Sequence, residues 1–248
     1  MASSNQQTYG DVLTSNISPL TSQKKYAIIV AGGSGSRMQS PLPKQFLLLC
    51  GRPVLMHTMG AFHNCESQPE IILVLPSAFH AYWQQLCADH QFNIPHQLVN
   101  GGETRFHSVK NGLELISDAA EALVAVHDAA RPLISPQIID RAYQYAAEHG
   151  NAITAVKCRD SVRRVVNDVS RSLLRDEIYL VQTPQIFKSS QIIKAYAQPY
   201  QVKFTDDAGV VEETGIKIEL IEGSYRNIKI TMPEDILLAE ALLSMHGS

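Results

Sequence analysis

Short apolar runs alternate with helical segments along almost the whole chain, and this alternation constrains the fold more than any other feature of the sequence. Residues 26–31, 71–75, 123–127 and 152–156 are apolar runs of five or six residues, the length of a buried strand. Strands that alternate with helices pair in parallel through right-handed crossovers. The sequence therefore predicts an α/β fold with a mostly parallel sheet, and ligands are expected at the carboxyl ends of its strands.

The remaining elements follow from the same patterns. Thr231 and Glu234 are spaced as a capping box that opens the last helix. Helices are predicted at residues 53–62, 77–90, 103–116, 135–149, 189–196, 206–214 and 233–243, and short strands at 98–99, 218–221 and 227–230.

The composition fits a globular domain and excludes several other classes of protein. The chain has 248 residues, of which 45% are hydrophobic and 18% charged, so it can bury a sizeable core in one large domain or two small ones. Its net charge of −3 lacks the basic footprint of a nucleic-acid-binding protein. No apolar run approaches the ~20 residues that span a bilayer, and no secretory signal opens the chain. We therefore expect a cytoplasmic protein with neither nucleic-acid nor membrane partners.

The cysteines and histidines do not have the spacing of metal ligands. Cys50, Cys65, Cys87 and Cys158 include no close pair, and the nine histidines include no H-x-x-x-H motif. We expect four reduced thiols and no structural metal ion.

Two segments depart from the alternating pattern. Residues 1–24 are rich in Ser, Thr, Asn and Gln and are predicted to form a flexible polar tail ahead of one domain at 25–248. Residues 157–178 carry many charges, with short apolar stretches around a polar turn at 167–172. This pattern is typical of a β-hairpin that buries little of itself. It is either a solvated hairpin or an arm that reaches a partner subunit.

A glycine-rich turn directly follows the first strand. Gly32, Gly33 and Gly35 let backbone N–H groups face an anion, and Arg37 and Lys44 add positive charge beside them. The turn is not a Walker loop, because no Lys-Ser/Thr pair closes it. It is not a G-x-G-x-x-G dinucleotide fingerprint either, because Met38 stands where the last glycine of that motif is needed. The preceding strand and the two cations favour a polyphosphate site over an ordinary turn.

A second pair of glycines leads into the helix predicted at 103–116. Arg105 and Ser108 lie on one face near the start of this helix, after Gly101 and Gly102. That face and the N-terminal N–H groups are suited to a nucleobase or ribose. The alternative is a helix start with ordinary polar residues.

Further polar side chains follow later strands. Asp128 and Arg131 would either hold a hydroxyl and a phosphate or form a structural ion pair at the end of their strand. Thr183, Thr205 and Lys229 offer hydroxyl and ammonium donors at the ends of predicted elements. Taken singly, each of these three is more typical of a structural role.

The motifs occur in a characteristic order: Gly32-Gly33-x-Gly35-x-Arg37-Met38 with Pro43-Lys44-Gln45, then His127-Asp128-Ala129-Ala130-Arg131-Pro132, then Thr183-Pro184-Gln185, then Asn227-Ile228-Lys229-Ile230-Thr231 with Pro233-Glu234-Asp235. In this order the chain resembles the 2-C-methyl-D-erythritol 4-phosphate cytidylyltransferase family over residues 25–245. The resemblance implies a single Rossmann-like nucleotidyltransferase domain with a protruding β-arm. It also implies a homodimer in which the arm at 157–178 completes the partner's active site.

The resemblance implies a role for each matching residue. The phosphates and ribose of CTP would contact Ala31, Gly32, Gly33, Gly35, Arg37 and Lys44, and its cytosine would contact Gly101, Gly102, Glu103 and Ser108. A polyol phosphate would contact Asp128, Ala129, Arg131, Thr183, Thr205 and Lys229. The arm would contribute Arg175 and Ser161 to the neighbouring subunit. Ser161 stands where the family has threonine, so the hydroxyl is kept and the methyl group is lost.

The implied reaction is an in-line attack of the acceptor phosphate on the α-phosphorus of CTP, with pyrophosphate as the leaving group. Two anions that react need charge neutralisation and alignment more than covalent catalysis. Arg37, Lys44 and Lys229 are the implied catalytic cations. Mg²⁺ would assist them, held mainly by the CTP phosphates rather than by protein ligands.

Two other functions stay open from the sequence. Ribitol-5-phosphate cytidylyltransferases share the CTP half and the stretch at 41–46, but tend to carry Val and Ser where this chain has Ala130 and Thr205. An inactive nucleotide-binding scaffold is the alternative of another class. The presence of Arg37, Lys44 and Lys229 argues against the scaffold, because binding alone does not require all three cations.

Overall fold

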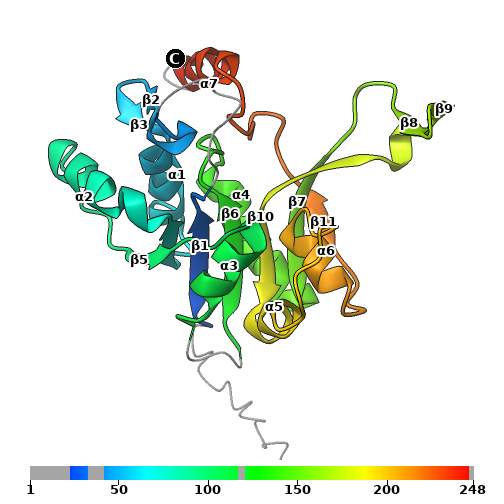
Figure 1. The fold of residues 1–248 in the computed structure, drawn as a ribbon, viewed down its shortest axis with the longest axis horizontal. Coiled ribbons are helices and arrows are strands. Elements are labelled where there is room, and N and C mark those ends of the chain that lie inside the picture. The colour runs from blue at the N-terminus through cyan, green and yellow to red at the C-terminus, as the bar shows by residue number, and fades with distance from the viewer. Residues whose placement is uncertain (1–22, 33–41, 117–120, 246–248) are drawn as a thin grey trace, which may run out of the picture.

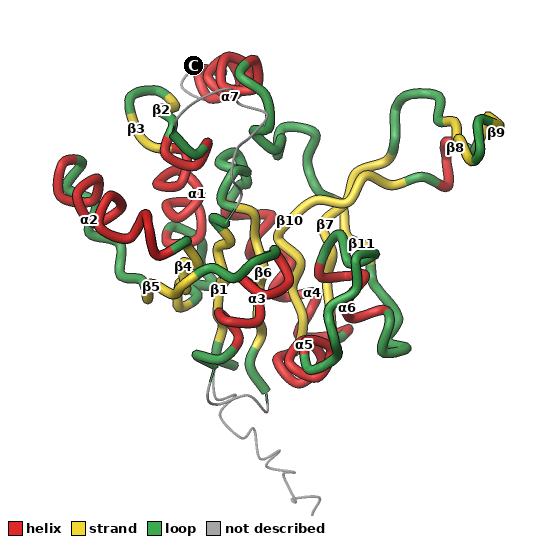
Figure 2. The backbone as a smooth tube through the Cα atoms, in the orientation of Figure 1, coloured by secondary structure: helices red, strands yellow, loops and turns green. Residues whose placement is uncertain are grey.

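The computed structural model describes residues 23–32, 42–116 and 121–245, and at its centre is a seven-stranded sheet (Figures 1 and 2). The strands lie in the order β11-β7-β10-β6-β1-β4-β5. β10 runs antiparallel to both of its neighbours, and the other pairs are parallel. This confirms the predicted α/β fold. The strands are β1 Lys25–Val30, β4 Glu70–Leu75, β5 Gln97–Asn100, β6 Leu123–Asp128, β7 Asn151–Lys157, β10 Tyr179–Lys188 and β11 Leu220–Glu222.

Helices cover both faces of the sheet and form two apolar cores. Successive residues of β1 show the division, since Ala27 and Ile29 pack into one core while Ile28 and Val30 pack into the other. The first core is closed by α1 Val54–His63, α2 His80–Asp89 and α4 Pro136–His149. The second core is closed by α3 Arg105–Leu113, α5 Ser189–Tyr196 and α6 Asp207–Glu212.

A third, smaller apolar cluster lies above the carboxyl end of β6. It joins the last helix, α7 Glu234–Ser244, to the short hairpin β2 Leu48–Leu49 and β3 Arg52–Pro53. Ala130, just after β6, and Ile230 belong to this cluster, and the N–H of Ile230 donates to the Ala130 carbonyl over 2.8 Å. The segment that carries Lys229 is therefore fixed against the end of β6.

The segment between β7 and β10 projects from the body as an arm (Figure 1). Its hairpin is β8 Arg163–Val166 and β9 Val169–Ser172, followed by the 3-10 turn η4 Arg175–Glu177. Asn167 and Asp168 alone form the turn, with φ of 47° and 62°, a conformation that asparagine and aspartate tolerate. The predicted turn at 167–172 was therefore wrong, because β9 occupies most of it.

Three other details differ from the sequence prediction. β10 was missed, because Pro184 and its polar neighbours interrupt the apolar pattern. Residues 227–230, predicted as a strand, form no ladder. The predicted capping box of Thr231 and Glu234 is wrong: α7 begins at Glu234 after Pro233, and the acid that accepts the N–H and the hydroxyl of Thr231, over 2.7 and 3.0 Å, is Asp235.

Within the described ranges, no helix is long and apolar enough to span a membrane. All four cysteines carry free thiols. The predicted tail falls outside the described residues apart from its last two positions.

Candidate active site

The site forms where the chain changes direction across the sheet. From β1 the chain proceeds to β4 and β5 on one side and then returns to β6 on the other side of β1. The N–H of Ala31 donates to the Val74 carbonyl over 2.8 Å, and the N–H of Ala129 donates to the Val30 carbonyl over 3.1 Å. The two segments that leave β1 and β6 consequently diverge around a crevice, the position at which open α/β sheets bind their ligands.

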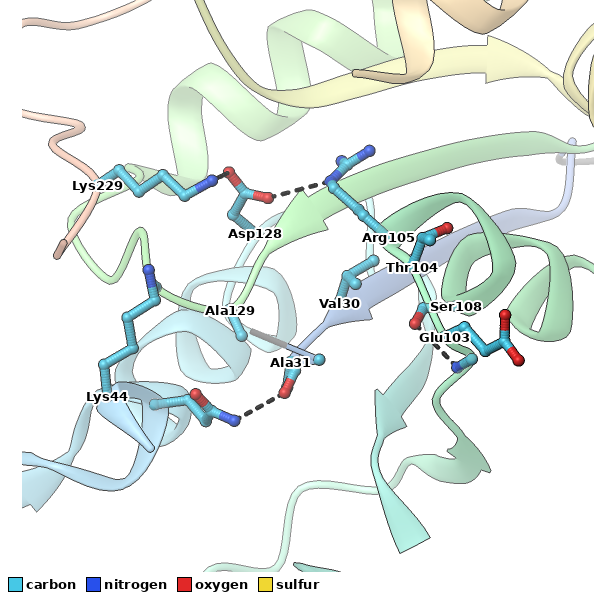
Figure 3. A pocket seen from close by; sticks show the side chains of 14 residues that line it. Val30, Ala31, Lys44, Glu103, Thr104, Arg105, Ser108, Asp128, Ala129 and Lys229 are labelled. Carbon is cyan, nitrogen blue, oxygen red and sulfur yellow. Dashed lines mark hydrogen bonds and ion pairs between the residues drawn. The ribbon is translucent and has the colours of Figure 1, made fainter. Parts of the chain in front are cut away.

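A cleft of about 170 Å³ occupies this crevice (Figure 3). Lys44 and Lys229 line it from the side of β6, and Glu103 and Ser108 line it from the side of α3. Nine predicted site residues line this first pocket: Ala31, Gly32, Lys44, Gly102, Glu103, Ser108, Asp128, Ala129 and Lys229. Gly101 lies beside them, with its N–H bonded to the Leu75 carbonyl. Gly33, Gly35 and Arg37 lie outside the described residues.

The glycine turn before α3 is closely packed. The Gly102 N–H donates to the Ser108 hydroxyl over 3.0 Å, and Thr104 caps the helix by accepting the His107 N–H. A Cβ atom on Gly102 would lie 2.4 Å from the Cβ atom of His107. Only glycine therefore allows this turn to close over the start of the helix.

Substitution Gly102→Ala is expected to lower the free energy of unfolding by about 1–3 kcal/mol, the usual effect of forcing an extra methyl group into a packed site. The matched control is Gly60→Ala within α1, where an added Cβ meets nothing within 4 Å. This control is expected to stabilise the protein by up to about 1 kcal/mol, because alanine favours a helix. Urea denaturation of both variants measures the two effects. Equal stability of Gly102→Ala and the wild-type protein would contradict the assignment.

Asp128, the last residue of β6, is surrounded by three cations. One carboxylate oxygen lies 2.9 Å from Nζ of Lys229 and 3.4 Å from Nε of Arg131, and the other lies 3.5 Å from Nε of Arg105. Burial by itself would raise the pKa of Asp128, but Arg105, Lys229 and Arg131 hold it well below its usual range. Asp128 is therefore ionised, and it fixes the positions of the cations around it.

A second pocket adjoins the first and shares three lining residues with it. Arg105, Asp128 and Lys229 line both pockets. The second pocket contains three further predicted residues, Arg131, Thr183 and Thr205. The structure thus separates most of the predicted CTP residues from most of the predicted acceptor residues, and it places the Asp128 cluster between them.

Buried hydrogen bonds hold the second pocket together. Thr183 accepts the Asp128 N–H over 3.0 Å, and the Asn227 amide donates to the Thr183 carbonyl over 2.8 Å. The guanidinium of Arg131 donates to the Asn227 carbonyl over 2.8 Å. Two more side chains hold the strand ends, because Gln45 donates to the Ala31 carbonyl and Thr58 to the Ala129 carbonyl. Asn227 and Gln45 belong to the sequence motifs, whereas Thr58 belongs to none of them.

Sequence reasoning also missed two residues behind the site. The guanidinium of Arg105 binds both carboxylate oxygens of Asp207, over 2.8 and 2.6 Å, and the Tyr196 hydroxyl donates to the same carboxylate over 2.6 Å. Arg105 and Ser108 line the same pocket, as their spacing predicted, and the guanidinium of Arg105 turns toward Asp207 at the back of it. The adjacent acids at 206 and 207, beside Thr205, were the available signal.

His127 lies in the core behind this cluster. Its Nε2 is 3.2 Å from the Arg131 carbonyl, which can only accept, so the proton lies on Nε2. Burial lowers the pKa of His127 to about 3. The folded protein therefore holds a neutral imidazole that closes the turn between Asp128 and Arg131.

This neutral histidine makes stability depend on pH. Below the ordinary histidine pKa of about 6.5, the unfolded chain takes up a proton that folded His127 refuses. The contribution of His127 to stability is therefore expected to fall by about 1.4 kcal/mol per pH unit as the pH drops from 6.5 toward 3. Imidazole NMR signals should show His127, recognised by its contact with the Phe62 ring, unprotonated at pH 5. A midpoint of titration near 6.5 would contradict this.

Ser161 and Arg175 lie on the arm and line neither pocket. Arg175 is exposed, and its guanidinium lies 3.4 Å from the Arg159 carbonyl and 3.6 Å from a carboxylate oxygen of Asp176. Apolar side chains accompany them, since Val165 is 63% and Leu174 is 69% exposed. Within one subunit, the structure does not bring these two predicted site residues to the cleft.

Comparisons with known proteins show which family and which known folds this chain is similar to. The family model for 2-C-methyl-D-erythritol 4-phosphate cytidylyltransferase matches residues 26–245. The protein of that name from Bacteroides thetaiotaomicron is 47% identical over 220 residues, which cover 89% of this chain and 100% of the relative. A crystal structure of 4-diphosphocytidyl-2C-methyl-D-erythritol synthase from Anaerococcus prevotii has a TM-score of 0.77 at 31% identity, covering 90% of this chain and 97% of that one. The 2-C-methyl-D-erythritol 4-phosphate cytidylyltransferase of Francisella tularensis has a TM-score of 0.73 at 32% identity, covering 88% and 99%.

Proposed function

The chain belongs to the 2-C-methyl-D-erythritol 4-phosphate cytidylyltransferase family, and from that premise we propose how its own residues carry the reaction. The protein is a nucleotidyltransferase that transfers CMP from CTP to 2-C-methyl-D-erythritol 4-phosphate. A phosphate oxygen of the acceptor bonds to the α-phosphorus of CTP while the bond to pyrophosphate breaks. The observation that carries our assignment is the pair of adjoining pockets, which share Arg105, Asp128 and Lys229.

CTP occupies the first pocket in this proposal. The backbone of Ala31 and Gly32 faces its phosphates, with Lys44 beside them, while Gly102 and Ser108 face its cytosine. The acceptor phosphate occupies the second pocket, against Arg131, Thr183 and Thr205. The α-phosphorus then lies at the boundary between the pockets, near Lys229.

The cations perform the catalysis by holding two anions together. Lys44 and Lys229 neutralise the phosphates as negative charge develops on the leaving group, and Asp128 keeps the Lys229 ammonium fixed before any substrate arrives. A fixed ammonium needs no reorganisation in the transition state. No protein nucleophile takes part, because the acceptor phosphate attacks directly.

We propose a divalent cation, Mg²⁺, as the cofactor, bound mainly by the CTP phosphates. Among the described residues, no group of three or more His, Cys, Asp or Glu side chains could hold a metal ion. The carboxylate of Asp128 is already engaged by three cations, so this donor set fits a cation that arrives with the nucleotide. Bound there, the cation would withdraw charge from the phosphate oxygens.

We also propose that the protein works as a homodimer whose arms complete each other's sites. Support comes from the arm itself, which projects from the body with exposed apolar side chains and carries Ser161 and Arg175 away from its own cleft. On a twofold dimer, each arm would reach the cleft of the other subunit.

Mixing two inactive variants tests this arrangement. If Lys44 acts within its own subunit and Arg175 acts on the partner, a dimer of Lys44→Ala with Arg175→Ala contains one intact site. Subunits mixed and reassociated at random are then expected to recover about a quarter of wild-type activity. A mixture no more active than its two components would show that each site is complete within one subunit.

The reaction itself is tested by following pyrophosphate release with the four nucleoside triphosphates and a panel of polyol phosphates. CTP with 2-C-methyl-D-erythritol 4-phosphate is expected to be turned over fastest. Preference for ribitol 5-phosphate would favour the related cytidylyltransferases instead. Binding of CTP without turnover of any acceptor would indicate an inactive scaffold.

A further inference from the structure

Arg105 is the only residue at the start of α3 that faces both pockets, among the residues the structure describes. Its backbone follows the glycine turn proposed to bind cytosine. Its guanidinium crosses behind the cleft, where Nε lies 3.5 Å from Asp128 and the other two nitrogens bind Asp207. A two-point contact of this kind fixes the plane of the guanidinium as well as its position.

Asp207 acts behind the cleft, not in it. Its side chain is 0% exposed, and it is absent from the described residues that line either pocket. A buried carboxylate is costly unless it is paired and hydrogen-bonded. Asp207 receives two bonds from Arg105 and one of 2.6 Å from the Tyr196 hydroxyl. The tyrosine itself is buried, and burial raises its pKa well above the ordinary value, so it remains a donor.

These residues join segments from opposite sides of the site. Arg105 belongs to α3 on the nucleotide side, whereas Asp207 begins α6, two residues after Thr205 on the acceptor side. Stacked aromatic rings lie beside the ion pair. The ring centroid of Phe106 is 4.6 Å from that of Tyr196 and 5.8 Å from that of Phe204. Displacement of either segment therefore moves the other.

We propose that Arg105, held by Asp207 and Tyr196, is a positioning residue that couples nucleotide binding to acceptor binding. Because the Arg105–Asp207 pair is rigid and Arg105 lines both pockets, a shift of α3 caused by the nucleotide is passed to α6, and a shift of α6 caused by the acceptor is passed back to α3. Coupling of this kind is reciprocal, so each ligand tightens the binding of the other by the same factor. The inference rests on the proposed assignment of the two pockets.

Calorimetry with unreactive ligands tests the coupling. The dissociation constant of a CTP analogue with a methylene group between its α- and β-phosphorus is measured with and without saturating 2-C-methyl-D-erythritol 4-phosphate. In the wild-type protein, the ratio of the dissociation constant without the acceptor to that with the acceptor is expected to be about five or more. Tyr196→Phe and Asp207→Asn are each expected to bring this ratio close to one.

Tyr143→Phe is the matched control. It also removes a buried tyrosine hydroxyl, which donates to the Tyr26 carbonyl over 2.7 Å, but Tyr143 packs in α4 on the other face of the sheet. This variant is expected to lose stability as Tyr196→Phe does and yet to keep the wild-type ratio. If Asp207→Asn fails to fold, the two tyrosine variants decide the outcome.

The two proposals fail in different ways. The coupling would be overturned if the acceptor did not change the dissociation constant of the analogue in the wild-type protein. It would also be overturned if Tyr196→Phe kept the effect seen in the wild-type protein, or if Tyr143→Phe lost the effect as Tyr196→Phe does. In each of these cases pyrophosphate release would continue. No pyrophosphate release from the wild-type protein with CTP and this acceptor would instead overturn the proposed function.

Discussion

Lys44→Ala is expected to lower the turnover number by a hundredfold or more, the effect of removing one preorganised donor from a transition state. Lys44 opens the 3-10 turn η2 Lys44–Phe46, and its neighbour Gln45 ties this turn to the end of β1 through the Ala31 carbonyl. The ammonium is thus held at the rim of the cleft before CTP binds (Figure 3). Since negative charge grows on the leaving pyrophosphate, the loss should fall mainly on kcat, measured by pyrophosphate release.

The matched control for this loss is Lys217→Ala. Lys217 is 84% exposed and precedes β11 at the edge of the sheet opposite the cleft, where it pairs with Glu219. Removing it changes the net charge by the same amount and should leave turnover within about twofold of wild type, because exposed charge pairs contribute little. If Lys44→Ala also retained near-normal turnover, Lys44 would have no part in the chemistry.

Asp128→Asn is expected to abolish most activity and also to destabilise the fold by about 3 kcal/mol. The substitution keeps the shape of the side chain but leaves Arg105, Arg131 and Lys229 close together without the carboxylate that neutralises them. Arg131 is mostly buried, so its charge cannot be relieved by water. Urea denaturation measures the stability, and the pyrophosphate assay measures the activity.

Asp140→Asn is the control for the loss of a carboxylate as such. Asp140 accepts the N–H groups of Glu66 and Ser67 over 3.1 and 2.7 Å, so its partners are neutral. This variant should lose only about 1 kcal/mol and keep its activity. A similar, small loss of stability in Asp128→Asn would mean that the three cations do not depend on the aspartate.

The sequence predicts best those parts of the fold whose residues face apolar surroundings on all sides. β1, β4, β6 and β7 are buried on both faces, so their apolar runs are continuous and easily recognised. β10 is buried at its centre too, but there it carries Gln182, Thr183 and Gln185, which form hydrogen bonds within the site. Because these polar residues interrupt its apolar pattern, β10 is not recognised as a strand from the sequence.

The candidate site divides in a similar way. The motifs single out Lys44, Asp128 and Lys229, and the structure brings these three residues to one cleft. Residues that act through other residues leave no such signal. Arg105 and Asp207 are 102 positions apart, and nothing in either local sequence indicates that they meet. Their pairing depends on how α3 and α6 pack on the same face of the sheet, which only the folded chain defines.

The reversed direction of β10 determines where the arm leaves the body. β6 and β7 both run antiparallel to β10, so the carboxyl ends of both strands lie on the side of the sheet that carries the cleft. β10 begins on that same side, so the connection from β7 to β10 does not cross a face of the sheet. The arm is therefore an ordinary hairpin loop that has been lengthened outward beside the cleft. A loop of this kind can gain or lose residues without moving any strand, so its reach is adjustable while the framework behind the chemistry stays fixed.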